Sequence, residues 1–231
     1  MLFPELARGE IDSMKVSSYW VKGIFRRVFQ KRKKKVFVIG FHKTGTSSMG
    51  HALQELGYRV CGSLKEGKYL ANSDTSFLTH LFQKAQPLLK KYDAFQDTPW
   101  FLMYEELYNK YPDAYFILTV RDAKSWLKSY QKHFKTDGYL YHDEIYGTLD
   151  SINEAAIFIK RYEAHVANVR DFFSSKGKLL EFRTGHDEWR KLTDFLNVKT
   201  PNTVFPHSNK AQHSIWMRSF KKSLKRLYYR S

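Results

Sequence analysis

The distribution of apolar residues divides the chain into short continuous runs and longer segments with helical periodicity. The runs predict strands at 36–39, 58–61, 92–95, 114–120 and 179–182. Between them, apolar residues at helical spacing predict helices at 46–57, 77–89, 98–110, 152–175 and 188–196, with a further helix directly after Asp122. Strands that alternate with helices predict an α/β fold in three layers, with a mostly parallel central sheet flanked by helices.

Two of the predicted strands read as buried strands of a parallel sheet. The run at 114–120 is apolar nearly throughout, and the run at 36–39 has the same character. If these strands are parallel, the loops that follow them open at one edge of the sheet, where α/β proteins bind ligands. The polar residues after each strand are therefore the first candidates for function.

The loop after residues 36–39 is bounded by Gly40 and Gly45 and leads directly into a predicted helix. A strand, a glycine-bounded loop and a helix together point backbone N–H groups and a helix N-terminus at one anion. The same segment supplies a lysine and a run of hydroxyls, namely Lys43, Thr46, Ser47 and Ser48. A phosphate group is the ligand that this combination favours.

The nucleotide-triphosphate P-loop is the natural comparison for this segment. Gly40 and Gly45 have the separation found in that motif, but Thr46 stands where the motif has its lysine. The lysine of this chain lies inside the loop, at Lys43. The pattern therefore argues against ordinary ATP or GTP chemistry.

A second candidate phosphate site follows the strand at 114–120. Arg121 closes this strand, and Ser129 lies about two turns into the next helix. A guanidinium can hold a phosphate through paired hydrogen bonds, and a hydroxyl can complete the shell. The alternatives are an ion pair of Arg121 with Asp97 or Asp122, and for Ser129 a place on the helix surface without a ligand.

Both motifs resemble those of the sulfotransferases that use 3′-phosphoadenosine-5′-phosphosulfate (PAPS). Residues 41–48, Phe-His-Lys-Thr-Gly-Thr-Ser-Ser, resemble the loop that holds the 5′-phosphosulfate of the donor in that family. Residues 120–130 resemble the segment in which an arginine and a serine bind the 3′-phosphate. The tryptophan-bearing helix at 188–196 and the proline-containing coil at 201–209 also resemble the family, so the similarity spans about 36–209.

The resemblance implies a P-loop-type sulfotransferase that moves the sulfuryl group of PAPS to a hydroxyl or amine acceptor, without a metal, and releases the bisphosphate PAP. It implies that Lys43 neutralises charge on the leaving phosphate and that Arg121 and Ser129 bind the 3′-phosphate. The 5′-phosphosulfate would be held by the loop residues His42, Lys43, Thr44, Gly45, Thr46, Ser47 and Ser48. In relatives the coil at 201–209 passes near the nucleotide, so His207 and Asn209 are candidates for its contacts. The glycine-rich basic segment of the family's cytosolic members is not visible in this sequence.

Asp97 is our candidate for the base that takes the proton of the acceptor, because it follows the predicted strand at 92–95 and should lie at the same sheet edge. A role as a simple loop cap is the alternative for Asp97. Glu66, Asp74 and His142 are further candidates for the base. No pair of histidines has a spacing that requires a metal, and we assign no metal site.

Residues 131–150 are rich in aromatic side chains and charges, and their pattern is loop-like. We interpret this segment as a lid or as one wall of the acceptor site, because aromatic rings provide shape and binding area. A surface excursion that packs on the core is the alternative.

The net charge of +16 is concentrated at the two ends of the chain. Residues 22–35 contain eight basic residues and residues 210–231 contain seven, both without an acid, which leaves 24 basic and 23 acidic residues elsewhere. We predict basic amphipathic helices in extensions at 1–35 and 211–231, on either side of a domain at 36–210. Such helices fit a peripheral membrane contact or packing on the domain, and the nearly neutral middle does not favour nucleic acid as a partner.

A single cysteine, Cys61, excludes an internal disulfide, and no apolar run reaches the length of a membrane span. The first residues are charged and lack the apolar core of a signal peptide. We therefore expect a cytoplasmic protein, peripheral at a membrane surface if its ends bind one, that acts on a small-molecule, lipid or glycan acceptor.

Two other classes of function are compatible with parts of the pattern. A P-loop kinase or ATP-binding protein would use the glycine-bounded loop, but Thr46 in the lysine position counts against it. A non-catalytic protein that binds anions or membranes through the basic ends would show steep salt dependence and would not need Lys43.

Overall fold

In the computed structural model of this 231-residue chain, the described residues are Gly23, Arg26, 34–64, 76–134 and 141–207. Most of the predicted extension at 1–35 and all of that at 211–231 lie outside these ranges. The candidates Glu66, Asp74 and Asn209 also lie outside them.

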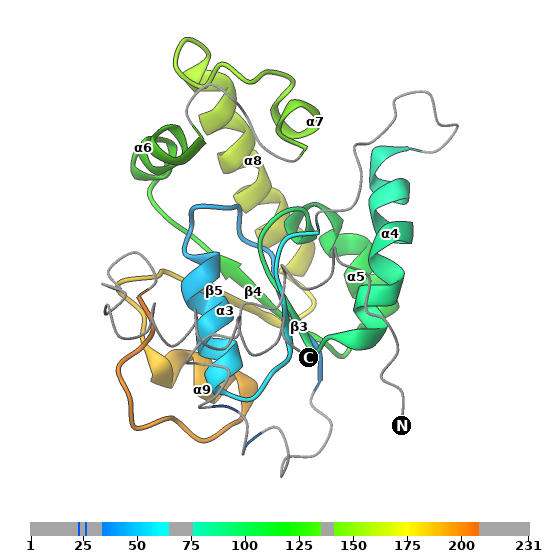
Figure 1. The fold of residues 1–231 in the computed structure, drawn as a ribbon, viewed down its shortest axis with the longest axis vertical. Helices are drawn as coiled ribbons and strands as arrows, with labels where there is room; N and C mark the ends of the chain where they lie inside the picture. Colours follow the sequence, from blue (N-terminus) through cyan, green and yellow to red (C-terminus); the bar gives the residue numbers. More distant parts are fainter. Residues whose placement is uncertain (1–22, 24–25, 27–33, 65–75, 135–140, 208–231) are drawn as a thin grey trace, which may run out of the picture.

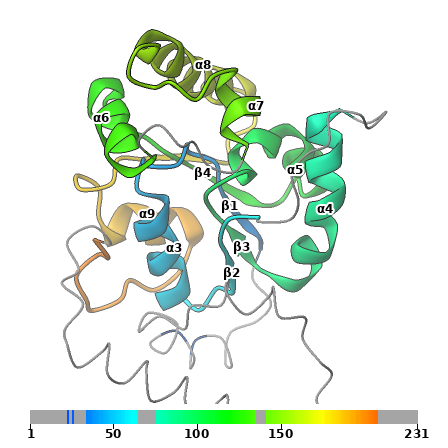
Figure 2. The same cartoon turned by 45° about the horizontal axis from the view of Figure 1, so that its top comes forward.

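The five strands form one parallel sheet, as the sequence pattern predicted. They are β1 (Val36–Val38), β2 (Val60–Cys61), β3 (Ala94–Phe95), β4 (Tyr115–Thr119) and β5 (Leu179–Phe182). Their order is β2-β3-β1-β4-β5, so β1 lies in the centre with β3 and β4 as its neighbours (Figures 1 and 2). The loops that follow β1, β3 and β4 therefore emerge side by side at the carboxyl edge of the sheet.

Helices cover both faces of the sheet (Figures 1 and 2). One face is covered by α3 (Thr46–Glu55) and α9 (Trp189–Leu196). The other face is covered by α4 (Phe77–Lys91), α5 (Tyr104–Lys110), α6 (Ala123–Phe134) and α8 (Ala155–Phe173), together with the short helix α7 (His142–Tyr146). This is the three-layer α/β arrangement that the sequence predicted.

Alternation along the central strands divides the core between the two faces. In β1, Phe37 belongs to the core under α4 to α8, whereas Val36 and Val38 belong to the core under α3 and α9. In β4, Phe116 faces the first core and Ile117 faces the second. Successive side chains of a strand point to opposite faces, so a strand that is buried on both faces must be apolar throughout.

Two segments differ from the sequence-based expectations. Residues 131–150 are not all loop, because α6 continues to Phe134 and α7 occupies part of the remainder. The ring of Phe134 lies 4.8 Å from that of Tyr130 and 4.6 Å from that of His142, and these aromatic contacts stabilise both helices.

The predicted helix at 98–110 begins as a 3₁₀ helix, η2 (Trp100–Met103), and continues as α5. Thr98 does not cap it, since the N-terminal cap residue is Pro99 and no side chain caps that end. The hydroxyl of Thr98 lies instead 3.3 Å from Nδ1 of His42, in the loop after β1.

Within the described ranges, no helix is both long enough and apolar enough to cross a bilayer. The same ranges contain no cluster of three histidine, cysteine or acidic side chains that could hold a metal ion.

Candidate functional site

The carboxyl edge of the sheet brings together polar residues that are far apart in sequence. Lys43 follows β1, Asp97 follows β3, Arg121 follows β4 and Arg183 follows β5. Because β3, β1, β4 and β5 are consecutive parallel neighbours, the order of the residues along this edge is Asp97, Lys43, Arg121 and Arg183.

The loop after β1 is folded tightly against the end of β4. The hydroxyl of Thr44 donates to the carbonyl of Phe41 at 2.5 Å and lies 2.6 Å from the hydroxyl of Thr119. A Cβ atom at Gly40 would lie 2.3 Å from the carbonyl oxygen of Thr119, so only glycine permits this approach. The hydroxyl of Thr44 is thus used inside the loop, and only its backbone and outer surface remain for a ligand.

Replacing Gly40 with alanine is expected to lower the free energy of unfolding by about 3 kcal/mol, because the new methyl group would overlap the backbone of β4. Urea unfolding followed by circular dichroism measures this change. Gly62→Ala is the matched control, since its Cβ would approach only the Gln96 side chain, at 3.6 Å. Equal stability of the two variants would refute the packing argument.

The first turn of α3 presents backbone N–H groups that no side chain caps. Gly45 is the N-terminal cap residue, with φ of 104° and no side-chain hydrogen bond to the turn. Gly45 and Ser48 line a cleft, whereas Thr46, which is buried, and Ser47, which is exposed, do not. An anion at this helix end would meet the backbone of the turn and the hydroxyl of Ser48.

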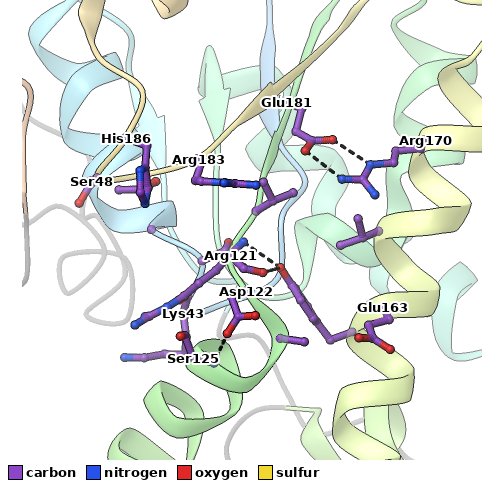
Figure 3. Close-up of a pocket in the computed structure, with 18 of the residues that line it drawn as sticks. Lys43, Ser48, Arg121, Asp122, Ser125, Glu163, Arg170, Glu181, Arg183 and His186 are labelled. Carbon is purple, nitrogen blue, oxygen red and sulfur yellow. Dashed lines mark hydrogen bonds and ion pairs between the residues drawn. The ribbon is translucent and has the colours of Figure 1, made fainter.

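This cleft has a volume of about 880 Å³, which is the size of a site for a nucleotide or a drug-sized ligand. It is lined by the loop after β1, the start of α6, one face of α8 and the turn between β5 and α9. In Figure 3, Lys43, Arg121 and Ser125 lie close together, and the paired side chains of Arg170 and Glu181 lie farther along the cleft.

The side chain of Arg121 is exposed in the cleft, and its backbone is held in place by Tyr162. The hydroxyl of Tyr162 accepts from the N–H of Arg121 at 2.9 Å and donates to its carbonyl at 2.7 Å. The guanidinium forms one long hydrogen bond, to the carbonyl of Lys43 at 3.5 Å, and no carboxylate of the described residues forms an ion pair with it. Asp122 instead accepts from the N–H of Ser125 at the start of α6, at 2.9 Å. The ion-pair alternatives for Arg121 are therefore not formed.

The serine that reaches the cleft from α6 differs from the predicted one. Ser125, on the first turn of α6, lines the cleft beside Arg121, whereas Ser129, one turn later, is partly buried and does not line it. Sequence reasoning missed Ser125 because it placed a hydroxyl by its separation from Arg121 and not by its distance from the strand end.

The turn after β5 supplies two further residues that sequence reasoning treated only as loop. The hydroxyl oxygen of Thr184 is buried without a hydrogen-bond partner among the described residues, and it lies 2.2 Å from the position of a Cβ at Gly45. Arg183 lines the same cleft, and its guanidinium forms no ion pair within the described ranges, whereas Arg170 is held by Glu181 at 2.8 Å. The signal that could have found both is their position directly after a strand of the sheet.

Lys43 lies where opposing charges act on its ammonium group. It is partly buried, and burial lowers its pKa; the positive charge of Arg121 acts in the same direction, while the negative charge of Asp97 opposes both. Its backbone has φ of 68°, in the left-handed region that side chains rarely adopt. The side chain is thus held near the cleft and near Asp97 by the shape of the loop.

Asp97 is a partly buried carboxylate in the loop after β3 and does not line the cleft. Burial raises the pKa of Asp97. Three interactions act in the opposite direction: the N–H of Thr98 donates to the carboxylate at 3.0 Å, the hydroxyl of Ser63 donates to it at 3.3 Å, and Lys43 contributes a positive charge. A carboxylate with a raised pKa is a better proton acceptor than an ordinary one. Its bond to the N–H of Thr98 also ties the carboxylate to the backbone of its own loop.

The ring of His42 is not directed into the cleft. It is buried, with Nδ1 against the hydroxyl of Thr98 and Nε2 at 2.8 Å from the hydroxyl of Tyr146. Burial lowers its pKa well below the ordinary value, with smaller contributions from His142 and Lys43. Both ring nitrogens of His42 are thus engaged inside the protein, and the predicted contact of this residue with the phosphate stays a prediction.

Other sequence candidates are also placed by the structure. His207 lines the cleft, at the end of the described chain. His142 is fully buried beneath the loop, stacked on His42 with ring centres 4.8 Å apart, and so is not available as a base for an acceptor in the cleft.

Two buried histidines, His142 and His165, should make the folded protein less stable in acid. Burial lowers the pKa of His142 and of His165 to about 4 in the folded protein. The unfolded chain binds a proton at each of them near pH 6.5, so stability is full above that pH and falls as the pH drops toward 4. Each contributes a loss of roughly 2 kcal/mol between pH 7.5 and pH 5.

His165→Gln is expected to remove roughly 2 kcal/mol of this pH-dependent loss, because glutamine can still donate to the carbonyl of Ile39 but cannot take up a proton. Urea unfolding at both pH values measures the difference. His186→Gln changes an exposed histidine and should keep the wild-type slope. Parallel pH profiles for all three proteins would contradict the role of His165.

Comparison with known proteins adds independent findings. A family model described as "Sulfotransferase domain" matches residues 35–214, which is most of the chain. A curated relative from Aspergillus versicolor, "Ava biosynthesis cluster protein M", is 25% identical over an alignment of 210 residues, with 75% of this chain and 80% of the relative covered.

Proposed function

The chain belongs to the sulfotransferase domain family, and on that basis we propose that it transfers the sulfuryl group of PAPS to a hydroxyl or amine acceptor without a metal. The observation that carries the proposal is the position of Lys43. It lines the cleft together with Arg121, and its pKa responds to Asp97 as well as to Arg121. One cation thus lies between an anion-binding cleft and a candidate base.

The donor would occupy the cleft with its two phosphate groups at separate positions. The N-terminal turn of α3, with Gly45, Ser48 and the unpaired hydroxyl of Thr184, would hold the 5′-phosphosulfate. Arg121 and Ser125 would hold the 3′-phosphate, with Arg183 as a second guanidinium in the same cleft. Ser129, one turn later on α6, would then not contact the phosphate directly.

Sulfuryl transfer depends mainly on positioning and on stabilisation of charge. The oxygen of the acceptor attacks sulfur, the bond from sulfur to the bridging oxygen breaks, and a new bond from sulfur to the acceptor oxygen forms. Lys43 would stabilise the negative charge that develops on the bridging oxygen. Asp97 would take the proton that the acceptor loses and later release it to water, so that PAPS and the acceptor give the sulfated acceptor, PAP and one proton.

The class of acceptor and the cellular setting are also proposed. We propose a small-molecule, lipid or glycan acceptor that approaches from the side of Asp97, and a cytoplasmic protein that touches membranes through its basic ends. The lone buried thiol of Cys61, whose pKa is raised to about 12 by burial, fits a protein that needs no disulfide.

Calorimetric titration tests the proposal against the kinase alternative. Titrations with PAP in EDTA and with ATP in Mg²⁺ should give tight binding of PAP that does not need a metal, and weak binding of ATP. Preferential, Mg²⁺-dependent binding of ATP would move the chain to the kinase class.

A further inference from the structure

The buried ring of His42 connects three segments of the candidate site. Its Nδ1 lies 3.3 Å from the hydroxyl of Thr98, in the loop after β3, and its Nε2 lies 2.8 Å from the hydroxyl of Tyr146, in α7. The backbone carbonyl of His42 accepts a hydrogen bond from the indole N–H of Trp126, in α6, at 2.9 Å. Imidazole offers hydrogen bonds in two directions, and here both are used inside the protein.

The residues beside these contacts have unusual backbone conformations. Lys43, directly after His42, has φ of 68°, and Asp97, directly before Thr98, has φ of 77°. A residue with a Cβ atom adopts the left-handed region at a cost in free energy, and it stays there where its surroundings impose the conformation. Both residues with a proposed chemical role are thus held in conformations that need external support.

The hydrogen bond between His42 and Thr98 provides a direct tie between these two positions. β1 and β3 are paired only as far as Phe37 and Phe95. Beyond that point, within the described ranges, no backbone hydrogen bond joins residues 40–45 to residues 96–99. The side-chain bond therefore holds the two loops together where the sheet no longer does.

The burial of this connection favours a fixed geometry. His42 and Thr98 are each 2% exposed, and Trp126 is fully buried. The His42 ring lies 5.7 Å from that of Phe101 and 5.3 Å from that of Phe134, so it has little freedom to turn. In a close-packed interior, a small shift of such a ring is passed to the residues bonded to it.

We propose that His42 is a positioning residue, which sets the separation of Lys43 and Asp97 through its hydrogen bond to Thr98. This inference rests on the proposed function, because it concerns the distance between a charge-stabilising lysine and a base. It predicts that loss of the bond slows the chemical step and leaves the donor cleft, whose lining does not include His42, nearly intact.

The central variants are Thr98→Val and His42→Phe, assayed with an acceptor that the wild-type protein sulfates. Thr98→Val removes the hydroxyl and keeps the shape, and it should lower kcat about 10-fold. His42→Phe keeps a ring and removes both hydrogen bonds, and it should lower kcat about 100-fold. The Kd for PAP should change less than about threefold in both variants, since His42 does not line the cleft.

Two further variants separate positioning from a general loss of stability. Tyr130→Phe removes the bond of an equally buried tyrosine to Nδ1 of His142, 2.7 Å long, which does not reach the loop of Asp97. It should lower Tm as much as Thr98→Val and keep kcat within about twofold. His42→Asn retains a polar group near the position of Nδ1 and should recover part of the kcat lost in His42→Phe.

A readout that does not need turnover separates this inference from the proposed function. The Tm losses of Thr98→Val and His42→Phe should be clearly less than additive in the double variant, because both remove the same bond. The inference is overturned by wild-type kcat in Thr98→Val, by additive Tm losses, or by kcat losses that simply follow Tm across all four variants. Absence of sulfuryl transfer by the wild-type protein, with the Tm coupling present, would refute the proposed function alone.

Discussion

Replacing Lys43 by methionine is expected to lower kcat for sulfuryl transfer about 100- to 1,000-fold, because one charge that stabilises the leaving group is lost. Methionine keeps most of the length of the side chain and an apolar stem, without the charge. The Kd for PAP should rise less than about tenfold, since backbone groups of α3 and Arg121 remain in place. Initial rates with labelled PAPS and calorimetry with PAP measure the two quantities separately.

Lys128→Met is the matched control for this experiment. Lys128 lies on α6, is exposed and does not line the cleft, so it reports the effect of one lost positive charge on the overall field. It should leave kcat within about twofold. A Lys43→Met protein with wild-type kcat, or one that loses PAP binding as strongly as kcat, would contradict the role of Lys43 in the chemical step.

Replacing Arg121 by alanine is expected to weaken binding of PAP about 100-fold, because a bidentate, charged contact to a phosphate is lost. The backbone of Arg121 should keep its place, since Tyr162 holds its N–H and carbonyl and not its side chain. Calorimetric titration gives the affinity, and thermal unfolding confirms that the fold is retained.

A ligand without the 3′-phosphate identifies which group Arg121 contacts. Adenosine 5′-monophosphate should bind the wild type and Arg121→Ala within about threefold of each other, whereas PAP should discriminate between them. Lys124→Ala, an exposed lysine on α6 that does not line the cleft, provides the charge control. Equal losses for both ligands would show that Arg121 acts elsewhere than on the 3′-phosphate.

The fold was predictable because its signals are periodic and local. The apolar runs at 36–39 and 114–120 predicted buried strands, and β1 and β4 are found there, as parallel neighbours. The end of α6 and the existence of α7 were less accessible. Phe134 and His142 are ordered by aromatic contacts between distant segments, which no local pattern records.

Strand ends predicted part of the candidate site for the same reason. Lys43, Asp97 and Arg121 each follow a strand, and a parallel sheet must bring such residues to one edge. The inward direction of the His42 ring, and the fact that Ser125 and not Ser129 lines the cleft, depend on side-chain packing and helix phase. Those properties are set by tertiary contacts, and a motif comparison cannot supply them.

The most direct test of the central claim is transfer of label from ³⁵S-labelled PAPS by the full chain, in EDTA, to a panel of phenols, alcohols, amines and glycans. The account predicts that label moves to an organic acceptor, with one PAP formed for each sulfuryl group transferred, and that Lys43→Met lowers the rate of transfer about 100- to 1,000-fold. Transfer that is undiminished in Lys43→Met, or a wild-type protein that labels no acceptor class while it transfers phosphate from ATP, would contradict it.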